Sequence, residues 1–333
     1  MPTQTNAVFL LSHEAFAAVY DEPVQVRIRR QSNLLATICP GEMWRDHRPA
    51  LARAEVIFSG WGAPRMDEDF LKAAPALKAI FYAGGTVRYF ATEALWARGV
   101  RLTTAQAINA IPVSEFAASA ILLGLKRFWH HADATRRHRT FASNRPLHGA
   151  YGSRVGLLSY GIIARQTRAR LRALEIEVLV YDPYLDETEA AAEGIRKVSL
   201  DDLFSACDVV SVHTPLIPET VGLVGRRQLE RMKPGAVFLN TARGEIVNEP
   251  ELIAVLTLRP DLQAVLDVTA PEPPLPDSPL YTLPNVVLTP HIAGSVGPEC
   301  LRMGHAMADE FERYRAGADL RWEISVDRSA LLA

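Results

Sequence analysis

The 333-residue chain has little cysteine and almost no net charge. Its three cysteines, Cys39, Cys207 and Cys300, are far apart and show neither metal-ligand nor disulfide spacing, so we read them as reduced thiols. A formal net charge of −2 gives no reason to expect a polyanionic partner. We therefore predict no metal centre and no nucleic-acid partner.

Long apolar runs are also missing. No stretch approaches the roughly 18 apolar residues that suggest a membrane span. The first residues, MPTQTNAVFLLSHEAF, lack the basic start of a signal peptide. With 48% hydrophobic and 22% charged residues, the composition is that of a soluble globular protein with ample material for cores. We expect a cytoplasmic protein without a membrane partner.

What the chain does contain is a regular alternation of short apolar segments and helical patterns, which favours doubly wound parallel sheets of the α/β class. Helical patterns include residues 66–75, 112–129 and 249–259. The segments predicted as strands are 7–12, 54–59, 77–83 and 100–105, followed by 154–160, 177–182, 208–214, 236–242, 263–269 and 285–290.

The two series of strands predict two domains. A long helix near 112–130, with Pro112 in its first turn, is the expected boundary. Its basic continuation, 130–149, is expected to be an exposed connection or a subunit-contact arm. The helical pattern at 295–317 is expected to return to the N-terminal domain. The prediction is a discontinuous domain of residues 1–108 and 294–333, and a continuous one of residues 109–293.

Residues 159–164, Ser-Tyr-Gly-Ile-Ile-Ala, follow a predicted strand and lack two of the three glycines of the G-x-G-x-x-G pattern. Gly161 remains where the backbone must approach a pyrophosphate, and Ala164 is tolerated at the third position. Ser159 is the real departure, although serine is a good turn former. Asp182 ends the next strand, about 20 residues on, where it can accept hydrogen bonds from ribose hydroxyls and repel a 2′-phosphate. From this segment alone, a dinucleotide site and a plain turn are equally good interpretations.

Three residues with complementary chemistry follow the last three predicted strands: Arg243, Glu272 and His291. Loops beyond the carboxyl ends of parallel strands line the ligand crevice, so all three are expected to share one cleft. Arginine grips a carboxylate with two hydrogen bonds, histidine exchanges a proton near neutral pH, and glutamate orients an imidazole. Taken singly, each has an ordinary structural explanation; together they predict hydride transfer on a 2-hydroxy acid.

These segments resemble the D-isomer-specific 2-hydroxyacid dehydrogenase family. The resemblance runs from residue 59 to 321. It implies a Rossmann-type cofactor domain inserted in a flavodoxin-like substrate domain, with NAD as the cofactor. It also implies a homodimer, for which the helix at 112–130 and its basic arm are the interface candidate. The segments that carry it are NAIPVSEFAASAILL (109–123), CDVVSVHTPLIPET (207–220), MKPGAVFLNTARG (232–244), LDVTAPEPP (266–274) and SPLYTLPNVVLTPHIAG (278–294).

By the same resemblance, Arg243 would bind the substrate carboxylate and carbonyl, and His291 would be the acid/base with Glu272 as its partner. The implied cofactor contacts are Ser159, Tyr160, Gly161, Ile162 and Ile163 in the loop, Asp182, His213, Thr214 and Pro215 on the adenosine side, and Thr241, Ala242 and Asp267 on the nicotinamide side.

The implied substrate contacts lie in the N-terminal series. The amides of Gly84 and Gly85 would hold an anion as a backbone nest. Trp61 would cap an apolar or aromatic substrate side chain; an interdomain packing tryptophan is an equally good interpretation. Val87-Arg88 stand where the family usually has an acidic-polar pair, so that this loop can differ in conformation.

The predicted activity is that of an NAD-dependent dehydrogenase, or 2-oxoacid reductase, for a small D-2-hydroxy acid. Formate or phosphite oxidation is an alternative that Glu272 disfavours, because the formate enzymes usually lack this partner. A non-catalytic NAD-sensing scaffold, like the family's corepressors, stays open. The loop 59–64, SGWGAP, lacks the Arg-Ser segment of phosphoglycerate-handling relatives, which predicts weak activity on 3-phosphoglycerate unless Arg65 or Arg88 supplies the charge.

Overall fold

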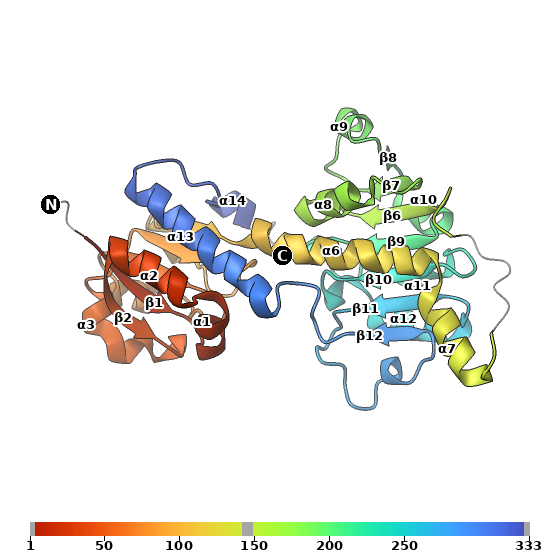
Figure 1. Cartoon of the computed structure of the whole chain (residues 1–333), viewed down its shortest axis with the longest axis horizontal. Helices are drawn as coiled ribbons and strands as arrows, with labels where there is room; N and C mark the ends of the chain where they lie inside the picture. The colour runs from red at the N-terminus through yellow and green to blue at the C-terminus, as the bar shows by residue number, and fades with distance from the viewer. Residues whose placement is uncertain (1–3, 142–148, 330–333) are drawn as a thin grey trace. The chain divides into compact units, whose positions relative to one another are not determined.

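The computed structural model describes residues 4–141 and 149–329 (Figure 1). The chain forms two compact units: Met1–Asn109 with Ser295–Ala333, called here the split unit, and Ala110–Gly294, called the continuous unit. The amide of Ser295 donates to Asn109 Oδ1 at 2.9 Å. The two points where the chain leaves the split unit are therefore tied together.

The sheet of the split unit has five parallel strands in the order β2-β1-β3-β4-β5. This is the flavodoxin-like order 2-1-3-4-5, which confirms the predicted fold class for this part of the chain. The sequence did not predict β2, an edge strand whose middle is half exposed and whose apolar run is broken by polar residues. The strands are β1 (Thr5–Leu10), β2 (Ser32–Ile38), β3 (Val56–Ser59), β4 (Ala79–Tyr82) and β5 (Arg101–Thr104).

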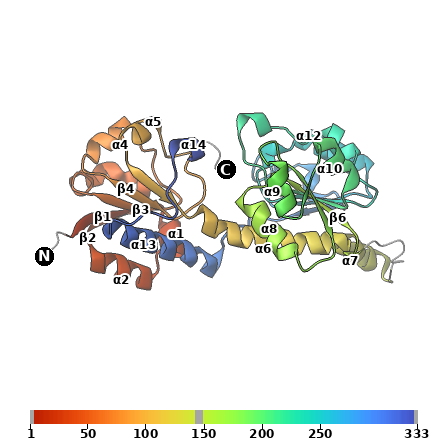
Figure 2. The ribbon, with the colours of Figure 1, turned by 90° about the horizontal axis from the view of Figure 1, so that it is seen from above.

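Helices cover both faces of this sheet (Figure 2). On one face the core is aromatic, with Phe9, Phe58, Phe81 and Phe311 buried together. Phe311 comes from α13, the helix near the C-terminal end that packs against α1, α2, β4 and β5. The helices on that face are α1 (His13–Val19), α2 (Glu22–Gln31) and α13 (Leu301–Arg315); those on the other are η1 (Gly41–His47), α3 (Arg48–Leu51), α4 (Glu68–Ala73) and α5 (Glu93–Ala97), and α14 (Val326–Ser329) follows α13 in the chain.

The continuous unit has seven parallel strands in the order β12-β11-β10-β9-β6-β7-β8. Counted from its own first strand this is the Rossmann order 3-2-1-4-5-6 with one strand added, so the second predicted parallel sheet is also confirmed. Only β8, two charged residues long, was not predicted. The strands are β6 (Arg154–Leu158), β7 (Glu177–Tyr181), β8 (Arg196–Lys197), β9 (Val209–Val212), β10 (Val237–Asn240), β11 (Gln263–Leu266) and β12 (Val286–Leu288).

Two layers of helices enclose this second sheet, and the apolar side chains of the strands are buried on both faces, as parallel sheets require. The layer on one face is α6 (Gln106–Leu125), α8 (Ile162–Leu171) and α9 (Glu187–Ala192), and on the other α10 (Leu200–Ala206), α11 (Arg226–Glu230) and α12 (Glu249–Leu258). Short 3₁₀ turns complete the chain: η2 (Pro218–Thr220), η3 (Gly244–Ile246), η4 (Pro279–Tyr281) and η5 (Gly297–Cys300).

Helix α6 corrects the predicted helix at 112–130. It begins at Gln106, where the amides of Ile108 and Asn109 both donate to Ala105 O at 3.0 and 2.9 Å, so Pro112 lies inside the helix instead of in its first turn. It ends at Leu125, and a left-handed Arg127 separates it from α7 (Phe128–His138). The rest of the predicted basic arm includes residues 142–148, which lie outside the described residues.

Helix α6 also qualifies the prediction that no segment resembles a membrane span. By length and composition alone it is apolar enough to cross a membrane, with a mean hydropathy of 1.6, but half of that window is buried inside the fold. Gly124 lies so close to the sheet that an added Cβ would stand 3.3 Å from Val237. The apolar composition of α6 is therefore explained by its burial as a core helix.

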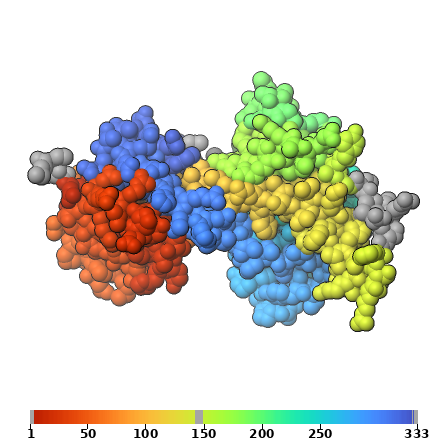
Figure 3. Space-filling model, in the orientation of Figure 1, coloured from red at the N-terminus to blue at the C-terminus, as the bar shows by residue number. Residues whose placement is uncertain are grey.

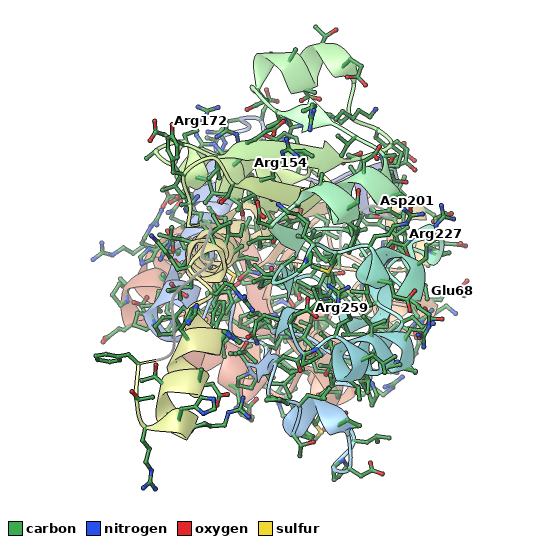
Figure 4. All side chains as sticks on the ribbon, turned by 90° about the vertical axis from the view of Figure 1, so that its right-hand side faces the viewer. Glu68, Arg154, Arg172, Asp201, Arg227 and Arg259 are labelled. Atoms are coloured by element: carbon green, nitrogen blue, oxygen red, sulfur yellow. The ribbon has the colours of Figure 1, made fainter. Side chains whose placement is uncertain are left out.

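Charged side chains of the continuous unit pair with each other at its surface. Figure 4 shows Asp201 of α10 beside Arg227 of α11, and the two form an ion pair. Arg172 pairs with Glu193 at 3.2 Å and Arg154 with Glu177 at 2.8 Å. Exposed pairs of this kind contribute little to stability, about 0–1 kcal/mol each, so the fold depends on its apolar cores.

Candidate active site

The strand order of the continuous unit reverses between β6 and β9, and the loops after these two strands carry most of the predicted cofactor residues. Ligands of open parallel sheets bind at such a reversal, beyond the carboxyl ends of the strands. Ser159 Oγ donates to Thr214 Oγ1 at 3.0 Å, and Thr214 Oγ1 donates to Leu158 O at 3.1 Å. The two loops are thereby tied to each other and to the end of β6.

The altered glycine loop forms a tight turn between β6 and α8. Ser159 has φ +72°, the left-handed conformation that glycine adopts without cost, so the serine takes a backbone conformation typical of glycine. Gly161 is the N-cap of α8, and a Cβ added there would meet no described heavy atom within 4 Å. The space in front of this helix start is open, and the amides of a helix start bind anions. Ala164 is fully buried, as close helix-strand packing demands.

Tyr160, next to Ser159 in the same loop, is held by contacts with Arg165 and Asp182. The Tyr160 ring is buried and Arg165 lies 4.6 Å from its centre, whereas Ile162 is 37% exposed. Asp182, after β7, accepts from the Tyr160 amide at 2.7 Å through Oδ2 and from the Tyr184 amide at 2.8 Å through Oδ1. A carboxylate has about four acceptor sites, so Asp182 can still accept from ribose hydroxyls.

Three buried polar atoms in the loops after β6, β9 and β10 lack a partner within the described chain: Tyr160 Oη, His213 Nδ1 and Thr241 Oγ1. His213 Nε2 lies 3.0 Å from Ser211 Oγ, and burial lowers the pKa of His213 to about 4, so the ring is neutral at pH 7. Unpaired buried polar atoms are costly, and a bound ligand can satisfy them. All three residues belong to the predicted cofactor set, so the residues present fit a dinucleotide.

The predicted catalytic residues are brought together. His291 Nδ1 lies 2.6 Å from Glu272 Oε1, and both side chains are about half exposed. An ionised carboxylate only accepts hydrogen bonds, so Nδ1 carries the proton it donates and Nε2 is left to face a substrate.

Arg243 lies beside this pair. Burial lowers the pKa of its guanidinium, and the charges of Glu272 and Glu245 act in the opposite direction. A guanidinium stays ionised in proteins. Its Nη1 donates to Ala242 O at 2.6 Å, and Asn240 Nδ2 donates to Arg243 O at 2.9 Å. The structure thus holds a cation, a carboxylate and an imidazole at three neighbouring strand ends.

The loop that carries His291 is held by Asp267. This buried carboxylate accepts from Thr289 Oγ1 at 2.6 Å, from the Ile292 amide at 2.9 Å and from the Ala293 amide at 2.8 Å. His291 itself has φ +54° and donates its amide to Asp267 O at 3.0 Å. Asp267 therefore serves the geometry of His291, whatever contact it makes with a cofactor.

The predicted substrate residues lie in the split unit, after β3 and β4. Trp61 is 39% exposed, and its carbonyl accepts from the Ser12 amide at 2.8 Å. The Gly84 amide already donates to Tyr82 O at 3.0 Å, which leaves Gly85 as the better donor of the predicted pair. Neither glycine has positive φ, so the alternating backbone of a nest is not formed there. Val87, in place of an acidic residue, is fully buried in the core.

Sequence reasoning missed two residues that hold candidate site loops, one in each unit. Tyr89 places its hydroxyl 3.0 Å from Tyr82 Oη and donates to Gly60 O at 3.3 Å, joining the two substrate loops. Glu249, at the start of α12, accepts from the Ala270 amide at 3.0 Å. Neither stands at the end of a strand, which was the criterion for choosing candidates. No group of three or more potential metal ligands occurs in the described part of the chain.

Comparison with known proteins agrees with this geometry. Residues 119–293 match the family model described as D-isomer specific 2-hydroxyacid dehydrogenase, NAD binding domain. The chain is 37% identical to a D-3-phosphoglycerate dehydrogenase of Mycobacterium bovis over 257 residues, which are 77% of this chain and 48% of the relative. It is 30% identical to a glyoxylate reductase of Korarchaeum cryptofilum over 289 residues, 83% of this chain and 86% of the relative.

A solved structure of D-mandelate dehydrogenase from Rhodotorula graminis superposes with a TM-score of 0.80 at 24% identity, covering 96% of this chain and 97% of that one, which is a likeness of fold. The chain spans about half the length of the phosphoglycerate dehydrogenases that it matches. The family match covers more than half of the chain and coincides with the Rossmann sheet, which confirms NAD as the cofactor. The chain belongs to the D-isomer specific 2-hydroxyacid dehydrogenase family.

Proposed function

We propose that the protein is an NAD-dependent oxidoreductase that interconverts a small D-2-hydroxy acid and its 2-oxo acid. The observation that carries the proposal is the contact of 2.6 Å between His291 and Glu272, with the charge of Glu272 also acting on Arg243. An imidazole oriented by a carboxylate, beside a guanidinium, is what proton exchange on a hydroxyl next to a carboxylate requires.

Each catalytic residue has one role in this proposal. NAD, when bound, supplies the hydride acceptor or donor. Arg243 binds the substrate carboxylate and polarises the neighbouring oxygen through paired hydrogen bonds. His291 gives a proton to that oxygen during reduction and removes it during oxidation, through Nε2. Glu272 fixes the imidazole in the tautomer that leaves Nε2 available and stabilises its positive charge.

The proposal assigns the cofactor and the substrate to different units. We assign NAD to the continuous unit, with Gly161 and the start of α8 at the pyrophosphate and Asp182 at the adenosine ribose, because the turn is open there and three buried polar atoms without a partner lie in the loops after β6, β9 and β10. We assign the substrate to the split unit, with Gly85 and Trp61 in the loops after its central strands. The same assignment predicts unphosphorylated substrates, since the loop with Trp61 lacks the Arg-Ser segment.

Turnover with a panel of 2-oxo acids and NADH tests the activity. Glyoxylate, hydroxypyruvate and pyruvate are the first substrates, and 3-phosphoglycerate with NAD tests the reverse direction. His291→Ala should reduce turnover about 10²–10⁴-fold, the usual contribution of a positioned acid/base, and leave NADH binding nearly unchanged. His305→Ala on α13 is the matched control and should keep full activity. Tight NADH binding without turnover on any of these acids would instead favour the scaffold alternative.

For the oligomeric state we propose a homodimer through α6 and α7. Leu122, Leu123 and Phe128 are 38, 37 and 49% exposed, and none of the described residues of α7 is buried. The yellow atoms of Figure 3 show these two helices running along one face of the continuous unit. We also propose that the protein is located in the cytoplasm.

Sedimentation or light scattering tests the dimer. Phe128→Asp should yield monomers, because a charge would be buried at the interface. Leu258→Asp, at a residue of α12 that is 72% exposed, should leave the dimer intact. A wild-type monomer, or a dimer that tolerates Phe128→Asp, would contradict this interface.

A further inference from the structure

We propose that Glu249 is a positioning residue for the proposed reaction: its carboxylate holds the backbone that places Glu272 against His291. The proposal rests on the proposed function. Glu249 is not at a strand end and contacts no proposed substrate or cofactor residue; its partner is the Ala270 amide, at 3.0 Å. Residues 267–273, which connect β11 to the Glu272 side chain, are called here the Glu272 loop.

Backbone packing holds one side of the Glu272 loop. Gly244, next to Arg243, lies so close that an added Cβ would stand 2.0 Å from the Thr269 carbonyl carbon and 2.6 Å from the Ala270 nitrogen. Within the loop, Thr269 Oγ1 donates to Pro271 O at 2.8 Å. Packing of this kind prevents the loop from moving towards Arg243 but does not prevent it from lifting away. The hydrogen bond from Ala270 to Glu249 supplies the missing restraint.

Two carboxylates on different elements thus hold the two halves of the His291–Glu272 contact. Asp267 accepts two amides immediately after His291, and Glu249 accepts one amide two residues before Glu272. Two residues of chain span at most about 7 Å, so a shift at Ala270 is passed to Glu272 with little damping. A misplacement of about 1 Å in a catalytic constellation costs about a hundredfold in rate.

An ordinary helix-capping role does not account for Glu249. The start of α12 is already capped by Asn248, whose Oδ1 accepts from the Glu251 amide at 3.3 Å. Burial raises the pKa of Glu249, and the Ala270 amide acts in the opposite direction. A carboxylate placed only for the helix dipole would stay in solvent, where its charge is not penalised. Glu249 is instead turned inward, onto one amide of the Glu272 loop.

Glu251 offers a matched control in the same helical turn. It has the same side chain, and its Oε2 accepts a backbone amide, that of Arg226, at 2.6 Å. Arg226 starts α11 and carries no proposed catalytic group. Substituting either glutamate removes one charge and one accepted amide from the start of α12. Only the substitution of Glu249 acts on the Glu272 loop.

The first experiment compares Glu249→Ala, Glu249→Gln and Glu251→Ala in the full chain, by steady-state reduction of the best 2-oxo acid. Glu249→Ala should lower kcat about 10- to 100-fold, as expected for a group that orients another, while the Kd for NADH changes less than about twofold. Glu249→Gln keeps an oxygen acceptor for Ala270 and should recover activity to within about threefold of wild type. Glu251→Ala should behave like wild type.

The second experiment needs no turnover. The ring signals of His291, assigned by comparison with His291→Ala, are recorded by NMR at one fixed pH in the substrate-free protein. In Glu249→Ala these signals should move from their wild-type chemical shifts to those found for Glu272→Ala, because the carboxylate no longer stays beside the imidazole. Glu251→Ala should keep the wild-type chemical shifts. If Glu249→Ala does not fold, Glu249→Asp replaces it in both experiments. Aspartate is one methylene shorter, so its carboxylate lies further from the Ala270 amide.

The outcomes separate the two proposals. A wild-type protein with no turnover on any 2-oxo acid would overturn the proposed function, and the NMR comparison would still decide whether Glu249 positions Glu272. An unchanged kcat together with unchanged His291 ring signals in Glu249→Ala would overturn the positioning role. Equal losses in Glu249→Ala and Glu251→Ala would also overturn it, since they would reflect a weakened helix start.

Discussion

Acidification from pH 7.5 to 5 should destabilise this protein through one residue, His213. His213 directly follows β9, at the reversal of strand order, and is 8% exposed. Its Nε2 meets Ser211 Oγ at 3.0 Å, and its Nδ1 has no partner in the described chain. Burial without a neighbouring carboxylate lowers the pKa of His213 from 6.5 to about 4. The native ring therefore stays neutral at a pH where an unfolded chain has already bound a proton.

The sign and size of the effect follow from this difference. Because the folded pKa of His213 is depressed, its contribution to stability is fully present above about pH 6.5 and is lost as the pH falls towards 4. Each unit between the two pKa values is worth about 1.4 kcal/mol. At pH 5 the loss should be about 2 kcal/mol, and well below pH 4 about 3 kcal/mol.

Urea unfolding at a series of pH values, followed by circular dichroism, measures this loss. His213→Gln cannot take up the proton, so its free energy of unfolding should fall by about 2 kcal/mol less than that of wild type between pH 7.5 and 5. The difference between the two proteins at each pH removes the contribution of all other titrating groups. His305→Gln, at a histidine outside this sheet, is the control. Parallel pH dependences of His213→Gln and wild type would refute the reasoning.

Three further expectations concern the site. Glu272→Ala should lower kcat about 10- to 100-fold in both directions, because no carboxylate then holds the imidazole of His291 in the orientation that leaves Nε2 available; an unchanged kcat would contradict the paired assignment. The kcat/KM with NADH should exceed that with NADPH by a factor equivalent to about 1–4 kcal/mol, because a 2′-phosphate would meet the Asp182 carboxylate. Asp182→Ala should reduce this ratio. Equal kcat/KM values with both cofactors in wild type would contradict the prediction. Gly244→Ala should reduce kcat about a hundredfold, because its Cβ must displace the backbone of Thr269; a fully active variant would show that this packing does not position the site.

Much of the fold could be predicted from the sequence because parallel strands buried on both faces are nearly continuous apolar runs. All strands predicted from such runs are present. The two that were missed, β2 and β8, are edge strands, one broken by polar residues and the other formed by Arg196 and Lys197. Edge strands are only partly buried, so their composition carries a weaker pattern. The start of α6 was misjudged because Pro112 is typical of a first helical turn, whereas tertiary packing extends the helix back to Gln106.

The candidate site divides in the same way. The chemistry of the site could be predicted from the chain alone, because Arg243, Glu272 and His291 follow strands whose carboxyl ends share one edge of a parallel sheet. How closely these groups meet could not be predicted, since the 2.6 Å contact of the pair depends on strand register and on the two carboxylates that hold their loops. Glu249 and Ala270 are 21 residues apart in the chain and come within 3.0 Å only because β10 and β11 are neighbours. No local pattern encodes such a contact, because its two ends belong to different strand-helix units.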